Sequence, residues 1–282
     1  MSSLNRKIKK IIASALALLL ALPLCACGEQ TPAGFRILEK IGTRRYNVIC
    51  RLDDRIAPQI DAAMERRAAS GELSAISIRW LGRDAITLKG TAAAEEEKEE
   101  TENAEGEGEE KGEEPAARRL IVGVEAEFDP LAFTEDGTLR GMSVDIAGAL
   151  AEALGREAAY QPIKPSEVGT QLSSGNIDCA LGFDPDTVSA GKYTVGVGYM
   201  ESDVVVAARA TGGAKRLRDA KGERIGVIDD PVVQKILKEN EKVTRYASGA
   251  TVYLSVRRCL NALDNGWCAA IAMDRIMLEH LS

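Results

Sequence analysis

The side chains that most often carry chemistry are scarce in this chain of 282 residues. It has a single histidine, His280, and only four cysteines beyond residue 27, namely Cys50, Cys179, Cys259 and Cys268. None of the four has the paired spacing of a zinc site, so neither a metal centre nor any other cofactor is expected. Cys259 and Cys268 are one candidate disulfide pair, but Cys179 and Cys268 lie in apolar runs that favour buried thiols.

The first 28 residues have the pattern of an export signal. Four basic residues between positions 6 and 10 precede an apolar run at 11–22 that is too short to cross a bilayer. The segment LCACG at 24–28 resembles a bacterial lipobox, in which cleavage leaves a cysteine that becomes lipidated. The fit is best at Cys27, so we predict a signal peptide at 1–26 and a lipid anchor on Cys27. An ordinary secretory signal is the alternative, and both place the mature chain outside the cytoplasm.

An acidic segment divides the remaining chain in two. Residues 92–117 hold twelve Glu and two Lys, a charge of −10, whereas the whole chain carries −7. Removal of the four basic residues of the signal would leave −11, so the mature chain outside this segment is close to neutral. The segment has too little apolar surface to offset its ordering entropy, which predicts a disordered tether with a span of about 28 Å. No part of the chain is basic enough for a nucleic-acid partner.

The two parts flanking the tether have the alternating pattern of an α/β protein. Before it, we predict strands at 37–39 and 46–52, a helix that begins at Asp53 or Asp54 and ends at Gly71, and a short helix at 73–81. After it, a hairpin turn is expected at 135–137. The further predicted strands are 121–124, 158–163, 178–183, 204–208, 225–228 and 268–272, and the further helices are 144–154, 166–173, 232–239, 252–263 and one from Asp274. Such alternation favours parallel sheets with ligands at the carboxyl ends of the strands.

Five segments after the tether carry motifs of one known family. They are VGVEAEF at 122–128, LRGMSVDIA at 139–147, LSSGNIDC at 172–179, LRDAKGERIGV at 217–227 and AAIAMD at 269–274. Together they resemble the bacterial family-3 solute-binding proteins, the polar amino-acid receptors of ABC importers. In that family a strand, a hinge strand and two helices follow the last motif. Here ILE at 37–39, YNVICRLD at 46–53 and SGELSAISIRWLG at 70–82 resemble those elements, so the resemblance implies a circularly permuted chain.

The resemblance also implies the architecture, a two-lobed periplasmic-binding-protein type 2 fold with two hinge strands and a ligand cleft between the lobes. The expected boundaries are 35–41 plus 203–282 for lobe 2, 45–90 plus 119–200 for lobe 1, 199–203 and 42–45 for the hinges, and 92–117 for the linker. The alternative, a spacer between independent domains, requires residues 35–90 to fold alone, and they are few for that.

The ligand residues that the resemblance implies are Glu125, Phe128, Gly182, Asp184 and Asp274. The position of Asp274 binds the amino group of the ligand in this family, and Asp184 replaces a Ser or Thr.

The family's cationic partners for a carboxylate are absent from their usual places. The arginine that grips the α-carboxylate falls at Ser189, no Arg lies between 182 and 200, and Lys192 offers only a point charge. The anion loop falls at 229–232, which reads DDPV. Because carboxylates have replaced cations, we expect an amine-bearing ligand, with a cation over the Phe128 ring.

Each of these residues also has a purely structural interpretation. Asp229 would cap the helix that follows Pro231, Phe128 would be a core residue, and Asp184 would stabilise a turn. The expected function is a monomeric, lipid-anchored receptor at the extracytoplasmic face of the membrane that delivers an amino acid or a cationic amine to an ABC permease. It is not expected to be an enzyme. The alternatives are a degenerate receptor that serves as a sensor or envelope partner, and a dehydratase-like enzyme with Glu125 and Asp184 as its acid–base pair.

Overall fold

The computed structural model describes residues 34–52, 54–90, 119–188 and 193–281, all within the compact unit Pro32–Ser282. The predicted signal peptide with Cys27, the acidic linker at 92–117, and the positions of Ser189 and Lys192 lie outside the described residues. Within the described ranges, no helix has the length and apolarity that a membrane span requires.

An eight-stranded mixed sheet forms the backbone of the fold, in the order β10-β9-β11-β8-β1-β7-β2-β6. Its longest strands are β1 (Phe35–Arg51) and β8 (Tyr193–Arg209), which pair antiparallel along their whole length. The other strands of this sheet are β2 (Arg119–Val124), β6 (Glu157–Pro162), β7 (Cys179–Phe183), β9 (Arg224–Ile228), β10 (Gly249–Tyr253) and β11 (Ala270–Asp274). β3 (Glu127–Phe128), β4 (Ala132–Glu135) and β5 (Thr138–Arg140) form a second, three-stranded sheet.

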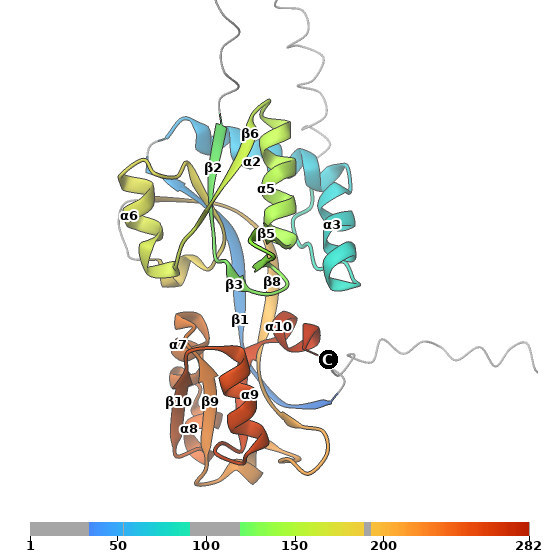
Figure 1. Cartoon of the computed structure of the whole chain (residues 1–282), viewed down its shortest axis with the longest axis vertical. Coiled ribbons are helices and arrows are strands. Elements are labelled where there is room, and N and C mark those ends of the chain that lie inside the picture. The colour runs from blue at the N-terminus through green and yellow to red at the C-terminus, as the bar shows by residue number, and fades with distance from the viewer. Residues whose placement is uncertain (1–33, 53, 91–118, 189–192, 282) are drawn as a thin grey trace, which may run out of the picture. The chain divides into compact units, whose positions relative to one another are not determined.

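The helices gather in two groups, one at each end of β1 and β8, as Figure 1 shows. One group contains α2 (Ile56–Ala69), α3 (Glu72–Leu81), α5 (Met142–Ala153), the 3₁₀ turn η1 (Pro165–Glu167) and α6 (Val168–Ser173). The other contains α7 (Pro231–Glu239), α8 (Glu241–Tyr246) and α9 (Val256–Asp264). The remaining elements are the 3₁₀ turns η2 (Pro185–Thr187) and η3 (Leu217–Ala220) and the last helix, α10 (Arg275–His280). The α/β fold class is confirmed.

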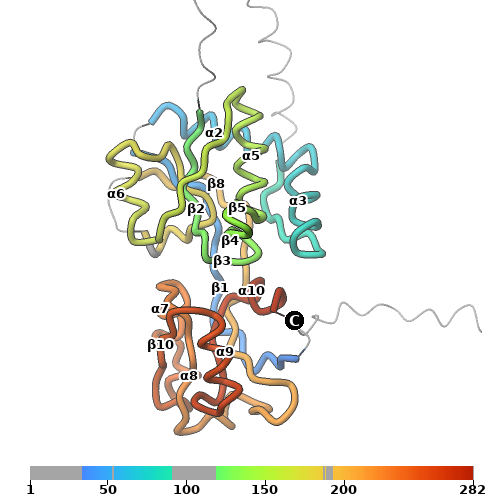
Figure 2. The backbone as a smooth tube through the Cα atoms, viewed as in Figure 1, coloured from blue at the N-terminus to red at the C-terminus, as the bar shows by residue number. Residues whose placement is uncertain are grey.

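The segment before the linker lies in the middle of the large sheet. β1 pairs with β8 on one side and with β7 on the other, although both partners come from the part of the chain after the linker. β7 in turn pairs in parallel with β2. Figure 2 shows this N-terminal segment, in blue, running from one helical group to the other beside β8. The two parts of the chain therefore share one sheet.

Two predictions about these elements are wrong. Two short strands separated at 42–45 were expected, but β1 is continuous, because β8 pairs with the whole segment through several bulges. Gly42 pairs with Val204 in this continuous strand, and glycine suits the position because a Cβ there would come within 2.6 Å of Ile236 on α7. The predicted strand at 204–208 is confirmed, although it is only part of the longer β8. The predicted helix at 252–263 is instead strand β10 followed by α9, which the Ser255 hydroxyl caps by accepting a hydrogen bond from Arg258 N.

Apolar faces of the strands build the cores under each helical group. Val206 and Val227 on the sheet pack with Val233 and Leu237 on α7 in one cluster. Val48 and Val122 pack in another cluster that also holds the buried faces of α2 and α5, which include Ile60 and Leu150. The predicted hairpin turn is confirmed, since Asp136 and Gly137 join β4 to β5. These two cores hold the strand ends from which the polar residues described next project.

Candidate ligand-binding site

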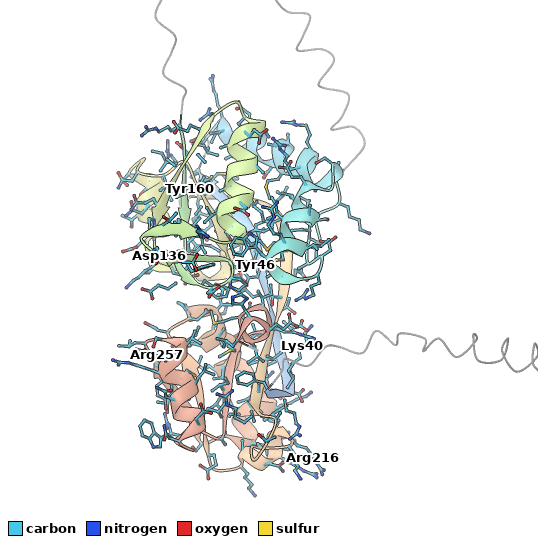
Figure 3. The ribbon with its side chains drawn as sticks, turned by 45° about the vertical axis from the view of Figure 1, so that its right-hand side comes forward. Lys40, Tyr46, Asp136, Tyr160, Arg216 and Arg257 are labelled. Atoms are coloured by element: carbon cyan, nitrogen blue, oxygen red, sulfur yellow. The ribbon has the colours of Figure 1, made fainter. Side chains whose placement is uncertain are left out.

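The predicted site residues lie at strand ends, but the structure joins them through residues that the prediction omitted. Glu125 follows β2, Phe128 ends β3, Gly182 lies in β7, Asp184 follows β7, and Asp274 ends β11. Glu125 and Phe128 contact the side chain of Arg44 on β1, and Asp274 contacts that of Tyr46 on the same strand. Figure 3 places Tyr46 midway along the molecule, between the two helical groups.

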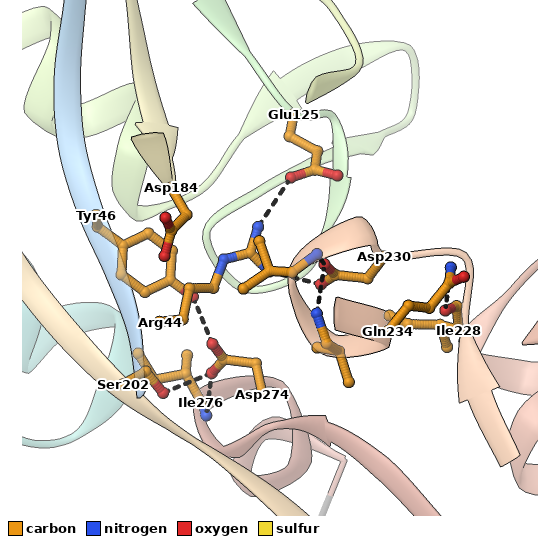
Figure 4. A network of polar contacts seen from close by, with 12 residues as sticks. Arg44, Tyr46, Glu125, Asp184, Ser202, Ile228, Asp230, Gln234, Asp274 and Ile276 are labelled. Carbon is orange, nitrogen blue, oxygen red and sulfur yellow. Dashed lines mark hydrogen bonds and ion pairs between the residues drawn. The ribbon is translucent and has the colours of Figure 1, made fainter. Parts of the chain in front are cut away.

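The guanidinium of Arg44 is the centre of this network, shown in Figure 4. Its Nη1 lies 2.5 Å from Asp230 Oδ2, and its Nη2 lies 3.4 Å from Glu125 Oε2. Its Cζ is 4.6 Å from the centroid of the Phe128 ring and 5.3 Å from that of the Tyr46 ring, which is within the range of cation–π attraction. The Arg44 side chain is only 1% exposed, so these groups replace its water.

Asp230 has two functions in this arrangement. Its carboxylate accepts hydrogen bonds from Val232 N at 2.9 Å and Val233 N at 3.3 Å, and so caps α7. The prediction assigned this cap to Asp229, which is wrong: Pro231 occupies the first helical position, so the residue directly before it is the cap. Asp229 is exposed and accepts a hydrogen bond from the Gln234 side chain instead.

Asp274 is buried and already has several internal donors. Tyr46 OH donates to one oxygen at 2.7 Å, while Ser202 Oγ and Ile276 N donate to the other at 2.6 and 2.8 Å. Burial raises the pKa of Asp274, and the opposite charge of Arg44 together with these hydrogen bonds counteracts the rise. The carboxylate therefore fixes β1, β8 and the start of α10 to one another.

Asp184 and Gly182 have structural reasons for their identity. The Asp184 carboxylate accepts hydrogen bonds from Asp186 N and Arg45 N, each at 2.9 Å, and so stabilises the turn η2, as the structural interpretation expected. Gly182 has φ +90°, a conformation that favours glycine, and a Cβ there would lie 3.1 Å from Ser143 Oγ. Phe128 is buried in the core, as its structural interpretation expected, and its ring also lies against the Arg44 guanidinium.

Protonation in this network is set by burial and by the single guanidinium. Burial raises the pKa of Glu125 to about 7, with Asp230 and Glu127 adding to the rise and Arg44 opposing it. Burial by itself lowers the pKa of Arg44, but the attraction of Asp230, and then of Tyr46 and Glu125, gives a net increase. Arg44 therefore stays charged at every pH at which the protein is folded, whereas Glu125 titrates near neutrality.

The sequence prediction missed Arg44, Tyr46, Ser202 and Asp230. It searched for a cation only between residues 182 and 200, whereas Arg44 lies in the segment before the linker. A signal was available, because Arg44 lies two residues before Tyr46 and four before Val48, so extending the predicted strand 46–52 backwards would place all three on one face. An arginine on the apolar face of a strand indicates a buried, paired charge.

Comparison with known proteins assigns the chain. The family model for bacterial extracellular solute-binding proteins, family 3, matches residues 120–266. The chain belongs to this family. Its match begins just after the acidic linker, and the segment that contains Arg44 lies outside it.

Among curated proteins, the arginine-binding extracellular protein ArtP of Bacillus subtilis (strain 168) is 27% identical over 117 residues, which cover 41% of this chain and 46% of ArtP. The chain thus matches about half the length of this relative. The solved structures similar to this chain include holo ArgBP from T. maritima, at 19% identity and a TM-score of 0.44, with 58% of this chain and 72% of that one covered. A substrate-binding protein of an ABC uptake transporter from Streptococcus pneumoniae, with bound histidine, has 21% identity and a TM-score of 0.47, with coverages of 58% and 68%.

Proposed function

We propose that this family-3 solute-binding protein binds a cationic small molecule, an amino acid or amine with an ammonium or guanidinium group, and delivers it to the permease of an ABC importer. The observation that carries the proposal is the excess of carboxylates around Arg44. Glu125 and Asp230 contact the guanidinium, and the charge of Asp274 also acts on it, so the network carries a net charge of −2 when all three carboxylates are ionised. An anionic ligand would be repelled there, whereas a cation would be stabilised.

The aromatic and partly exposed parts of the network fit this ligand class. The Phe128 ring already lies against a guanidinium at 4.6 Å. The Glu125 side chain is 22% exposed, so it is reachable from solvent, while Arg44 and Asp230 are buried behind it. The name of ArtP, an arginine-binding extracellular protein, is consistent with a cationic ligand.

We further propose that the chain is a rotated form of its family. The support is the central position of β1 between β8 and β7, together with a family match that begins only at residue 120. In this proposal lobe 1 comprises 45–90 and 119–200, and lobe 2 comprises 35–41 and 203–282. The linker at 92–117 joins the family's original ends, and a lipid on Cys27 anchors a monomer to the outer face of the membrane.

Calorimetry of the mature chain against a panel of amino acids and polyamines tests the ligand class. We expect saturable heat with arginine, lysine, ornithine or a polyamine and none with aspartate or glutamate. Glu125→Gln should weaken the binding of the cation, whereas the matched control Glu127→Gln, which removes the same charge from an exposed site two residues away, should change it little. Silence across the whole panel, or binding of the acidic amino acids alone, would refute the proposal.

A further inference from the structure

The contacts of Arg44 resemble those of a bound ligand more than those of a structural arginine. Its two terminal nitrogens contact the carboxylates of Asp230 and Glu125, which are 186 and 81 residues away, at the N-cap of α7 and on the loop after β2. The Phe128 ring covers one side of the guanidinium. Arg44 Nε, although buried, has no hydrogen-bond partner among the described residues. The guanidinium is thus held only by its far end.

The same three groups form a subsite suited to a free cation. Two carboxylates and an aromatic face are what a guanidinium or ammonium group requires to leave water. Glu125 at the partly exposed edge gives access, and Asp230 at the buried end provides the closest pairing. In this structure the side chain of Arg44 already fills that subsite, reaching it from β1 (Figure 4).

We propose that Arg44 is a tethered ligand, which fills the cation subsite of Glu125, Asp230 and Phe128 with the chain's own guanidinium and which a free guanidinium compound must displace in order to bind. The proposal deepens the proposed function and rests on it for the ligand class. A group attached to the same chain competes at an effective concentration of about millimolar or above. Small guanidinium compounds that contact this subsite alone therefore need millimolar or higher concentrations to bind the wild-type chain.

Removal of the side chain is the direct test. Arg44→Ala in the otherwise complete mature chain leaves room for ethylguanidinium, which has the shape of the missing end of arginine. Thermal melting and calorimetry with ethylguanidinium chloride should show saturable binding that is at least about tenfold tighter in the variant than in wild type. Sodium chloride at equal ionic strength controls for screening.

A neighbouring arginine provides the matched control. Arg45 lies on the same strand but is half exposed, and its guanidinium pairs with Asp186 at 2.9 Å. Arg45→Ala should bind ethylguanidinium no better than wild type. If Arg44→Ala folds only in the presence of ethylguanidinium, this dependence is itself the expected rescue. Arg44→Met, which keeps an apolar stem in place, is the second variant, and it should respond to the smaller guanidinium ion.

Two results would overturn the proposal: no saturable response in either Arg44 variant, or the same affinity in the variants and in wild type. A loss of carboxylate binding in Arg44→Ala would overturn it too, because Arg44 would then be an anion-binding group. Failure here is distinct from failure of the proposed function. If ethylguanidinium binds Arg44→Ala but no panel compound binds wild type, the tethered-ligand proposal holds and the proposed function is refuted. If arginine binds wild type tightly and binds Arg44→Ala equally well, the proposed function holds and the tethered-ligand proposal is refuted.

Discussion

Replacing Asp230 with Asn tests the buried pair at the centre of the network. Asp230 and Arg44 are 4% and 1% exposed and lie 2.5 Å apart, so their charges are compensated by each other rather than by water. Loss of one partner of a buried pair typically costs about 3–5 kcal/mol. Two features lower that cost here: Glu125 still lies 3.4 Å from Arg44, and Asn is as good a helix cap as Asp. We therefore expect a loss of about 3 kcal/mol for Asp230→Asn.

Thermal and urea unfolding followed by circular dichroism measure this loss, which for a chain of this size corresponds to a fall in melting temperature of about 6–12 °C. Asp229→Asn is the matched control, because Asp229 is exposed and its carboxylate accepts a hydrogen bond from the Gln234 side chain. It should stay within about 0.5 kcal/mol of wild type. Adding Arg44→Met to Asp230→Asn should recover part of the loss, because the unpaired charge is then gone. Equal melting of the two Asn variants would refute the buried-pair argument.

Three further predictions concern protonation, thiols and chain order. The Glu125 carboxyl, with its pKa raised from 4.5 to about 7, keeps its proton in the folded chain in a pH range where the unfolded chain loses it. The free energy of unfolding that this carboxyl contributes therefore falls as the pH rises through that window, by up to about 3 kcal/mol. Urea titrations of Glu125→Gln at several pH values should lack this decline, and parallel pH profiles of the variant and wild type would contradict the raised pKa of Glu125. All four cysteines beyond Cys27 are free and buried, so a thiol reagent should modify these four only after the chain unfolds, and modification of only two of them would indicate a disulfide. Moving residues 34–90 behind residue 281 and opening the chain at the linker should give a folded protein that melts within a few degrees of the original, whereas an unfolded product would contradict the proposed rotation.

The regular part of the fold was predictable because local patterns determine it. Residues 121–124 and 225–228 are short apolar runs and form buried strands β2 and β9, and Glu135-Asp136-Gly137 specifies the hairpin turn. The error at 42–45 has a non-local cause. Those residues are polar or glycine, and only their pairing with β8, about 160 residues later, keeps them extended.

The candidate site was predictable only in part, and for a related reason. Glu125, Phe128 and Asp274 lie on segments whose motifs are continuous in sequence, so a family pattern located them. Arg44 lies outside every such motif, and its partners Asp230 and Glu125 are distant along the chain. No local pattern contains the information that these three charges meet.

The position of Arg44 on β1 matters because this strand reaches both helical groups. The backbone of Arg44 pairs with β8, while its side chain reaches Asp230, the N-cap of α7. Tyr46, two residues further along β1, donates a hydrogen bond to Asp274, the N-cap of α10. A cation that displaced Arg44 would therefore change the contacts between β1 and two helices at once. In Arg44→Ala, where no tethered guanidinium competes, binding of a free cation depends on pH, because only the ionised form of Glu125 adds a second carboxylate to that of Asp230. Binding of ethylguanidinium to this variant should consequently strengthen as the pH rises through the pKa of Glu125, which is about 7 in wild type and higher once Arg44 no longer lowers it.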